Sequence, residues 1–409
     1  MINKEWKLNE YVTYLLLTLV LLSSWTDING IYTELPQIVV TQPEGWKLGA
    51  YIALFSSISN IAPLALVFCK CIFRKETLNI IPINYIVMII AIICFIFKFR
   101  ERLAFQYGRL SRPYDQATTT IALTRMGSDQ FIELSFGKVH YIYHSSANSS
   151  SSSTLNIFVH GFSIAMEMWQ DIFPSLVHDN QSCLVLDLYG RGWSDAPDVP
   201  MNVDLFVSQI AELLYALNLS YEKYNLYGVS MGGVIIQRFT ELYPSKVSKL
   251  ILCNSTGLNV VKPPSILISI LSIPVLGPLL FKFVMQRGDN KSVRAQWANP
   301  DSDEYKRCIK LYQQTCQQHP GYLRSLFSTI FYFDFQSAFK SIECIQKLNI
   351  PILILWGDKD TLTPVENAYR YNDFYKTSTL KIIPGANHSL LIEQPKQAID
   401  AIKTFLNDK

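Results

Sequence analysis

Long runs of uncharged, mostly apolar residues dominate the first hundred positions of the chain. Leu48 to Cys69, with 22 residues, and Leu78 to Phe97, with 20 residues, contain no charged side chain. Because a helix needs about 20 apolar residues to cross a bilayer, both runs predict membrane-spanning helices. The run from Tyr11 to Thr26 has 16 residues, so it spans only if the helix continues past the carboxylates that follow it. We expect about three transmembrane helices within residues 1–99.

Beyond a polar, basic connector at residues 100–127, the pattern changes to short strands and helices. Residues 131–143 alternate apolar and polar positions around a Phe-Gly-Lys triplet, which predicts a β-hairpin. Short apolar runs follow, separated by the helical patterns of residues 203–217 and 233–243. These runs are Asn156–Val159, Cys183–Leu188, Tyr224–Val229, Lys249–Asn254 and Pro351–Gly357. Apolar strands with intervening helices predict an α/β fold in residues 128–409, with a mostly parallel sheet covered by helices on both faces.

Composition supports this division and excludes several kinds of function. Charged residues make up 17% of the chain, below the roughly 25% typical of soluble domains. The net charge of +3 is small and the basic residues are scattered, so no nucleic-acid partner is expected. The eight cysteines are irregularly spaced in apolar sequence, which favours buried thiols over a disulfide framework. Cys69 and Cys71 have no partner pair, so no zinc site is predicted.

The candidate chemistry lies in the stretch LYGVSMGGV at residues 226–234. It places Gly228, Ser230 and Gly232 between a predicted strand and a predicted amphipathic helix. A Gly-x-Ser-x-Gly match alone is weak, but this is the context that a nucleophile elbow needs: the sharp turn exposes the serine hydroxyl, and the glycines allow the close packing. Ser230 is therefore the predicted nucleophile, and an ordinary turn serine is the alternative.

A serine nucleophile needs a base that takes its proton and an acid that orients the base. After such an elbow, the acid and then the histidine follow along the chain. Asp358 and Asp360 come directly after a predicted strand, and His388 follows the next strand. His319, the other downstream histidine, lies in a polar helical stretch and is expected on the surface.

An acyl-transfer intermediate also needs hydrogen-bond donors for its oxyanion. The sequence FVHGFS at residues 158–163 follows the first buried strand and contains the expected His-Gly loop, with Gly161 as its glycine. We expect the backbone N–H groups of Phe162 and Met231 to form the oxyanion hole. His160 is expected to order this loop rather than to transfer protons. The loop DLYGRGWSD at residues 187–195 is expected to have a structural role.

Together, these loops, the elbow, and the late acid and histidine resemble the alpha/beta-hydrolase superfamily over residues 125–409. Within it, the chain is most similar to monoglyceride-lipase-like and carbon–carbon-bond hydrolases with a Ser-Met-Gly-Gly elbow. The family pattern Gly-x-x-Asp followed by Pro matches Gly357, Asp360 and Pro364, which favours Asp360 as the acid and makes Asp358 a turn residue. The resemblance implies a serine hydrolase that requires no cofactor and no metal. It disfavours the epoxide hydrolase and dehalogenase branches, whose nucleophile is aspartate.

An insertion at residues 258–346 occupies the place where this superfamily carries a helical lid. It begins with the apolar run of residues 263–285, long enough to suggest a fourth span. Pro274 and Pro278 interrupt this run, and a span here would separate two strands of one sheet. We expect a hydrophobic lid that receives an acyl chain or faces the bilayer, with a plain buried cap as the alternative.

The opening of the chain resembles a second family. WTDINGIYTELP at residues 25–36, followed by PEGWKLGAY at residues 43–51, looks like the first helix and next loop of the eukaryotic riboflavin transporters. The similarity covers residues 9–99, whereas that family has many more spans. Asp27 is either a transport-site carboxylate or an interfacial residue. Three helices cannot enclose a polar path through lipid, which favours a membrane anchor.

The sequence thus predicts a multi-pass membrane protein whose anchored domain is a serine hydrolase. The expected substrate is a small-molecule or lipid ester, such as an acylglycerol. The alternative is a truncated or fused riboflavin transporter relative that mediates or assists riboflavin uptake. Basic clusters after the second and third expected spans would fall on opposite sides of the membrane, so the side that the hydrolase faces is left open.

Overall fold

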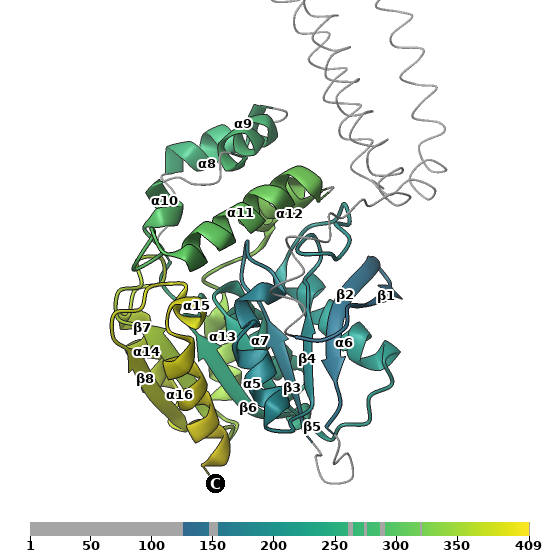
Figure 1. Cartoon of the computed structure of the whole chain (residues 1–409), viewed down its shortest axis with the longest axis vertical. Helices are drawn as coiled ribbons and strands as arrows, with labels where there is room; N and C mark the ends of the chain where they lie inside the picture. Colours follow the sequence, from purple (N-terminus) through teal and green to yellow (C-terminus); the bar gives the residue numbers. More distant parts are fainter. Residues whose placement is uncertain are drawn as a thin grey trace, which may run out of the picture. The chain divides into compact units, whose positions relative to one another are not determined.

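The computed structural model describes residues 126–146, 154–260, 265–273, 276–286, 291–319 and 321–408. The chain divides into two units at residue 100, and all described residues belong to the second unit. The membrane segment expected at residues 1–99 lies outside the described residues, as does the expected connector up to residue 125. Figure 1 shows the fold, with helix labels that start at α5.

An eight-stranded mixed sheet forms the centre of the domain. Its strands are β1 (Gln130–Leu134), β2 (Gly137–His144), β3 (Thr154–Val159), β4 (Cys183–Leu186), β5 (Lys223–Val229), β6 (Val247–Cys253), β7 (Ile352–Gly357) and β8 (Ser378–Ile383). The spatial order is β1-β2-β4-β3-β5-β6-β7-β8. β1 and β2 form the predicted antiparallel hairpin, and β2 also pairs antiparallel with β4. The remaining neighbours are parallel, as the continuously apolar runs predicted.

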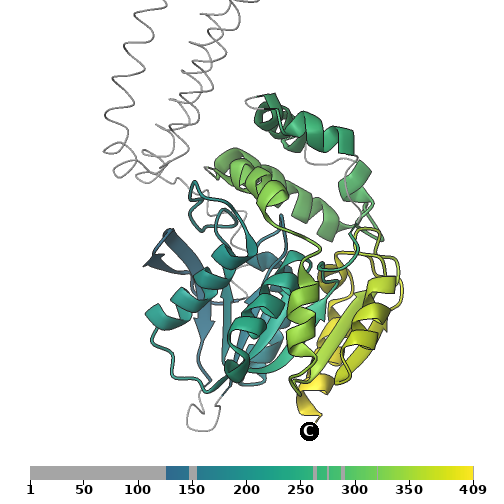
Figure 2. The same cartoon turned by 180° about the vertical axis from the view of Figure 1, so that it is seen from behind.

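Successive side chains of the central strands face two separate apolar cores. In β7, Ile352 and Ile354 lie in one core, whereas Leu353 and Leu355 lie in the other. The first core is completed by α6 (Val203–Ala216), α7 (Met231–Leu242), α13 (Ala338–Ile345) and α14 (Glu366–Phe374). The second contains α5 (Ile172–His178), α15 (Leu390–Glu393), α16 (Pro395–Asn407) and the 3-10 turn η1 (Met166–Trp169). Figures 1 and 2 show the sheet between these two helix layers. A further 3-10 turn, η2 (Pro244–Lys246), precedes β6.

The long insertion between β6 and β7 is helical in its described part. It contains α8 (Ser265–Leu271), α9 (Leu276–Met285), α10 (Lys291–Arg294), α11 (Asp303–Gln318) and α12 (Tyr322–Tyr332). We call α8 to α12 the lid. In both views α11 and α12 lie between the sheet and the outermost pair, α8 and α9 (Figures 1 and 2). α13 instead packs into the first core through Ile342 and Ile345.

The lid has a small core of its own. Leu271 of α8, Phe281 of α9, and Tyr322 and Leu326 of α12 are buried together. The apolar run at residues 263–285 forms two short helices in its described part, α8 and α9, rather than a single span. No helix among the described residues is long and apolar enough to cross a bilayer.

Candidate active site

Ser230 stands at the junction of β5 and α7 in a backbone conformation that few residues adopt. Its φ of 53° lies in the left-handed region, where a non-glycine residue is strained. The backbone holds it there, because the Ser230 N–H donates to the Cys253 carbonyl at 3.0 Å and its own carbonyl accepts from the Thr256 N–H at 3.0 Å. A side chain at Gly228 would meet the Gly232 carbonyl oxygen at 2.5 Å, and one at Gly232 would collide with the Val159 carbonyl. Both glycines are therefore required by close approach.

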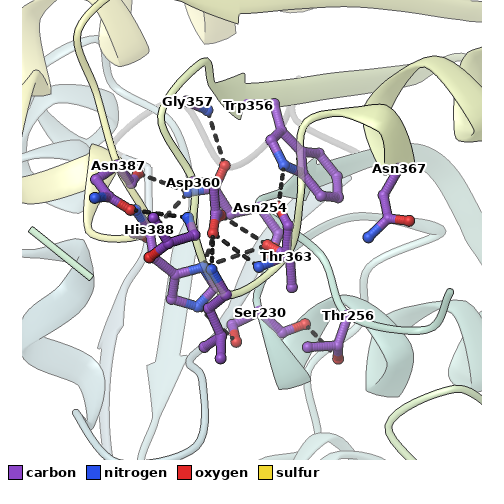
Figure 3. Close-up of polar contacts among 12 residues, drawn as sticks. Ser230, Asn254, Thr256, Trp356, Gly357, Asp360, Thr363, Asn367, Asn387 and His388 are labelled. Atoms are coloured by element: carbon purple, nitrogen blue, oxygen red, sulfur yellow. Dashed lines mark hydrogen bonds and ion pairs between the residues drawn. The ribbon is translucent and has the colours of Figure 1, made fainter. Parts of the chain in front are cut away.

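The structure brings Ser230, His388 and Asp360 into one hydrogen-bonded chain (Figure 3). His388 Nε2 lies 3.0 Å from Ser230 Oγ, and His388 Nδ1 lies 2.7 Å from Asp360 Oδ2. A carboxylate accepts, so Nδ1 carries the hydrogen, and Nε2 is left as the acceptor that faces the serine hydroxyl. All three side chains are buried, and Ser230 is only 8% exposed. This arrangement can remove the proton from Ser230 as its oxygen attacks a carbonyl carbon.

The loop after β7 saturates the Asp360 carboxylate. Oδ1 accepts from the backbone N–H groups of Leu362 and Thr363, both at 2.8 Å. Oδ2 accepts from the Thr363 hydroxyl at 2.7 Å in addition to His388. Asp358 is exposed and accepts from the Gly385 N–H at 2.7 Å. It is the turn residue that the sequence pattern indicated, and it is not directed at His388.

Three polar residues that sequence reasoning missed hold this chain in place, and all appear in Figure 3. Thr363 contacts Asp360 and lies 3.3 Å from His388 Nδ1 through its hydroxyl. Asn254 follows β6 with a φ of 41°, and its amide donates to the carbonyl oxygens of Asn387 and His388, both at 3.0 Å. Asn387 Oδ1 accepts from the His388 N–H at 2.8 Å. The only sequence signal was their position in the loops that follow three strands, β6, β7 and β8.

The His-Gly loop passes close to Ser230. A side chain on Gly161 would meet Ser230 Cβ at 3.2 Å. The buried His160 ring accepts from the Leu188 N–H at Nε2, 2.9 Å away, and donates from Nδ1 to the Gly161 carbonyl at 2.8 Å. Burial lowers the pKa of His160 to about 4, so the ring is neutral and has this one tautomer. It orders the loop, as the sequence suggested.

The contact between His160 and the Gly161 carbonyl also orients the Phe162 N–H. In a planar trans peptide the C=O and the N–H point in opposite directions. The Gly161 carbonyl points at His160, so the N–H of the same peptide, that of Phe162, points away from it. Met231 is the first residue of α7, where the helix supplies no acceptor for its N–H. Phe162 and Met231 thus have backbone donors beside the serine.

His319 departs from the sequence-based expectation of a surface position. It is buried at the end of α11, and its Nε2 lies 2.8 Å from the Ser194 carbonyl oxygen. A buried polar ring needs hydrogen-bond partners, and the Ser194 carbonyl of the loop at residues 187–195 supplies one. His319 is not part of the Ser230 chain. Within the described ranges, no group of three or more His, Cys, Asp or Glu side chains could hold a metal ion.

Residues 151–395 match the family model described as serine aminopeptidase, S33. The chain belongs to this family of alpha/beta hydrolases. It is 25% identical over 260 residues to the 2-hydroxy-6-oxo-6-(2'-aminophenyl)hexa-2,4-dienoic acid hydrolase of Metapseudomonas resinovorans, covering 61% of this chain and 83% of the relative. It is 23% identical over 259 residues to the human monoacylglycerol lipase ABHD6, covering 61% of this chain and 74% of the relative. The fold matches a bacterial membrane phospholipase A with a TM-score of 0.55 and 19% identity, over 80% of this chain and 97% of that structure.

The front of the chain matches a different family model. Residues 9–126 match solute carrier family 52, riboflavin transporter. This confirms the second resemblance, although the match continues past residue 99 through nearly all of the expected connector. The resemblance rested on the motifs at residues 25–36 and 43–51, and residues 100–126 contain no motif that indicated the match would extend so far.

Proposed function

We propose that the hydrolase domain is a serine hydrolase that cleaves carboxylic esters through an acyl-enzyme. The observation that carries this proposal is the hydrogen-bonded chain Ser230–His388–Asp360 on a strained elbow. Ser230 Oγ attacks the ester carbonyl carbon while His388 Nε2 takes its proton, and Asp360 stabilises the resulting imidazolium. The N–H groups of Phe162 and Met231 hold the oxyanion.

The second half of the reaction uses the same groups. The C–O bond of the ester breaks as His388 returns the proton to the leaving alcohol, which produces an acyl ester of Ser230. Water then gives a proton to His388 and its oxygen attacks the acyl carbon. Collapse of this second intermediate breaks the bond between the acyl carbon and Ser230 Oγ, releases the carboxylic acid, and restores the Ser230 hydroxyl with the proton that His388 returns. No cofactor or metal is needed for these steps.

We propose a lipid ester of the monoacylglycerol type as the substrate. The lid supports this choice, because apolar and aromatic side chains, including Phe162, Leu326 and Phe331, pack together beneath α8 and α9. The outer faces of α8 and α9 are also apolar: Ile266 is 70% exposed and Phe283 is 57% exposed. The names of two similar proteins, a monoacylglycerol lipase and a membrane phospholipase A, agree with this substrate class.

We further propose that residues 1–99 anchor the enzyme in a membrane as a multi-pass segment, with residues 100–127 as connector and residues 128–409 as the hydrolase. The uncharged runs and the match of residues 9–126 to riboflavin transporters support this division. Extraction of membranes at alkaline pH tests it, because an integral protein stays in the pellet. Full release into the supernatant would contradict the anchor.

The transporter match also favours a second candidate function, riboflavin transport or assistance to it. Transport needs helices on every side of the substrate path, so we expect the chain alone to move no riboflavin. Uptake of labelled riboflavin in transporter-deficient cells that express the chain tests this. Uptake above background would establish the second function.

A fluorophosphonate probe tests the serine hydrolase proposal directly, because it reacts with activated serines. Membranes that contain the full chain should be labelled, and Ser230→Ala should abolish labelling. Ser341→Ala is the matched control, because Ser341 is buried in α13 and contacts Glu241 instead of the site. Labelled wild type should then hydrolyse monoacylglycerols faster than short p-nitrophenyl esters. A folded wild type that is not labelled would overturn the proposal.

A further inference from the structure

Three successive carbonyls of the His-Gly loop each accept a hydrogen bond from a buried side chain. The Gly161 carbonyl accepts from His160, as described above. The Phe162 carbonyl accepts from Arg191 Nε at 3.1 Å, and the Ser163 carbonyl accepts from the Tyr322 hydroxyl at 2.7 Å. His160 belongs to the loop itself. Arg191 comes from the loop after β4 and Tyr322 from lid helix α12, so two distant segments fix the backbone that carries the Phe162 N–H.

Arg191 is held by the lid as well. Its side chain is fully buried, and burial lowers its pKa to about 10. Besides the Phe162 carbonyl, it donates to the Tyr189 carbonyl at 3.1 Å, to Ser325 Oγ at 3.2 Å and to Thr329 Oγ1 at 2.7 Å. The Phe162 and Phe206 rings lie 5.7 and 5.3 Å from the guanidinium carbon. The planar guanidinium thus joins the His-Gly loop to α12.

The contacting residues lie on one face of α12. Tyr322, Ser325 and Thr329 are spaced by three and then four residues, which places them on one side of a helix. A buried charge is costly unless its hydrogen bonds are satisfied, and the hydrogen-bond acceptors around Arg191 are neutral oxygens. A purely apolar contact would seat α12 at less cost. The polar contacts instead specify where the His-Gly loop lies relative to the lid.

We propose that Arg191 and Tyr322 are positioning residues of the oxyanion hole, and that lid helix α12 sets the orientation of the Phe162 N–H through them. The inference rests on the proposed serine hydrolase function, because it needs an oxyanion at Ser230. It follows that α12 must stay docked during catalysis. Access for the substrate then depends on the outer helices α8 and α9.

Tyr322→Phe is the decisive variant because it removes one hydroxyl and keeps the buried ring. Misplacing a catalytic group by about 1 Å can cost on the order of 100-fold in rate. We expect Tyr322→Phe and Thr329→Val to lower kcat on a p-nitrophenyl ester by about 10-fold to 100-fold while KM changes by less than about twofold. Affinity for a trifluoromethyl ketone, which forms a tetrahedral oxyanion on the serine, should fall by a similar factor.

Ser328→Ala is the matched control on the same helix. Its hydroxyl contacts Met201 and Val199 instead of the His-Gly loop, so kcat and inhibitor affinity should stay near wild type. All variants are compared as the full chain in detergent, with thermal unfolding as a check on folding. If Tyr322→Phe and Thr329→Val behave like Ser328→Ala, the positioning role is overturned. The proposed function still stands in that case, provided that the wild type is active. Wild type that neither hydrolyses esters nor reacts with fluorophosphonate would overturn both.

Discussion

The side-chain amide of Asn254 donates a hydrogen bond to the backbone carbonyl oxygen of His388 at 3.0 Å. Its side-chain oxygen accepts from the Gly357 N–H at 2.9 Å. Asn254 follows β6, Gly357 ends β7 and opens the Asp360 loop, and His388 follows β8. One buried amide therefore fixes the loop of the proposed base against the loop of the proposed acid.

Asn254→Asp tests the importance of this link. The carboxylate has the same shape and can still accept from Gly357, but its second oxygen would face the carbonyl oxygens of Asn387 and His388. We expect the free energy of unfolding to fall by about 2 kcal/mol and kcat to fall by about tenfold. Urea unfolding and ester hydrolysis measure the two effects.

Asn225→Asp is the matched control for that variant. Asn225 is also buried and its amide donates to Asn156, in the sheet and away from Ser230. We expect this control to lose stability while its kcat remains near wild type. Equal kcat values for the two variants would show that the Asn254 contact has no effect on the reaction.

Thr363 shares Asp360 Oδ2 with His388, and this predicts a graded effect of its hydroxyl. Thr363→Val removes one donor and leaves the backbone shape unchanged. We expect kcat to fall by about three- to tenfold, because Asp360 then orients His388 less strictly. Thr363→Ser keeps the donor and should restore most of the rate. A serine variant as slow as the valine variant would assign the loss to packing of the methyl group instead.

The elements that support the site were predictable from short-range patterns. Apolar runs located β3 to β7 within a few residues, because strands buried on both faces cannot contain many polar side chains. The spacing of Gly228, Ser230 and Gly232 indicated the elbow, whose strained backbone is a local property. The sequence pattern predicted that the helix after the elbow begins at Gly233. In the structure α7 begins at Met231, and Ser230 is the capping residue before its first turn.

The polar contacts around the site were not predictable in this way. Asn254 contacts a residue 134 positions away, and Arg191 contacts Thr329 across 138 positions. Asn254 does not differ locally from an ordinary loop residue, and the loop that contains Arg191 was expected only to have a structural role, so only the folded chain reveals the partners of both residues. His319 was assigned to the surface for the same reason: its helix is polar, and the Ser194 carbonyl that buries it comes from another part of the chain.

A cluster of charged residues around the buried His140 of β2 predicts how stability depends on pH. His140 Nδ1 lies 2.7 Å from Asp187 and Nε2 lies 3.0 Å from Asp129. Burial alone would lower the pKa of His140, but the hydrogen bonds and charges of the two carboxylates outweigh it and raise the pKa to about 9. Glu167 is buried nearby, and burial raises its pKa to about 7. The folded state therefore retains protons that the unfolded chain releases.

We expect the free energy of unfolding to fall as the pH rises. His140 has an ordinary pKa of 6.5 and a folded pKa of about 9, so its contribution is complete below pH 6.5 and is lost by about pH 9. The loss from His140 is roughly 3 kcal/mol. The contribution of Glu167 is already lost by about pH 7, so the fall in stability above pH 7 comes from His140. Urea unfolding of the full chain in detergent at several pH values measures it. His140→Gln should remove the slope between pH 7 and 9, and an unchanged slope would contradict the assignment.

The exposed apolar face of α8 and α9 predicts a difference between lipid and soluble substrates. Ile266 and Phe283 each present most of their side chain to the surroundings, and large exposed apolar patches mark contact with membranes, ligands or other proteins. We expect the double variant Ile266→Ser, Phe283→Ser to raise the apparent KM for monoacylglycerol in vesicles by about tenfold. Hydrolysis of soluble p-nitrophenyl butyrate should change by less than about twofold, because both residues lie outside the Ser230 site.

Tyr215→Ser is the control, since Tyr215 is 89% exposed but belongs to α6. Equal losses on both substrates would mean that the two residues stabilise the lid and do not contact lipid.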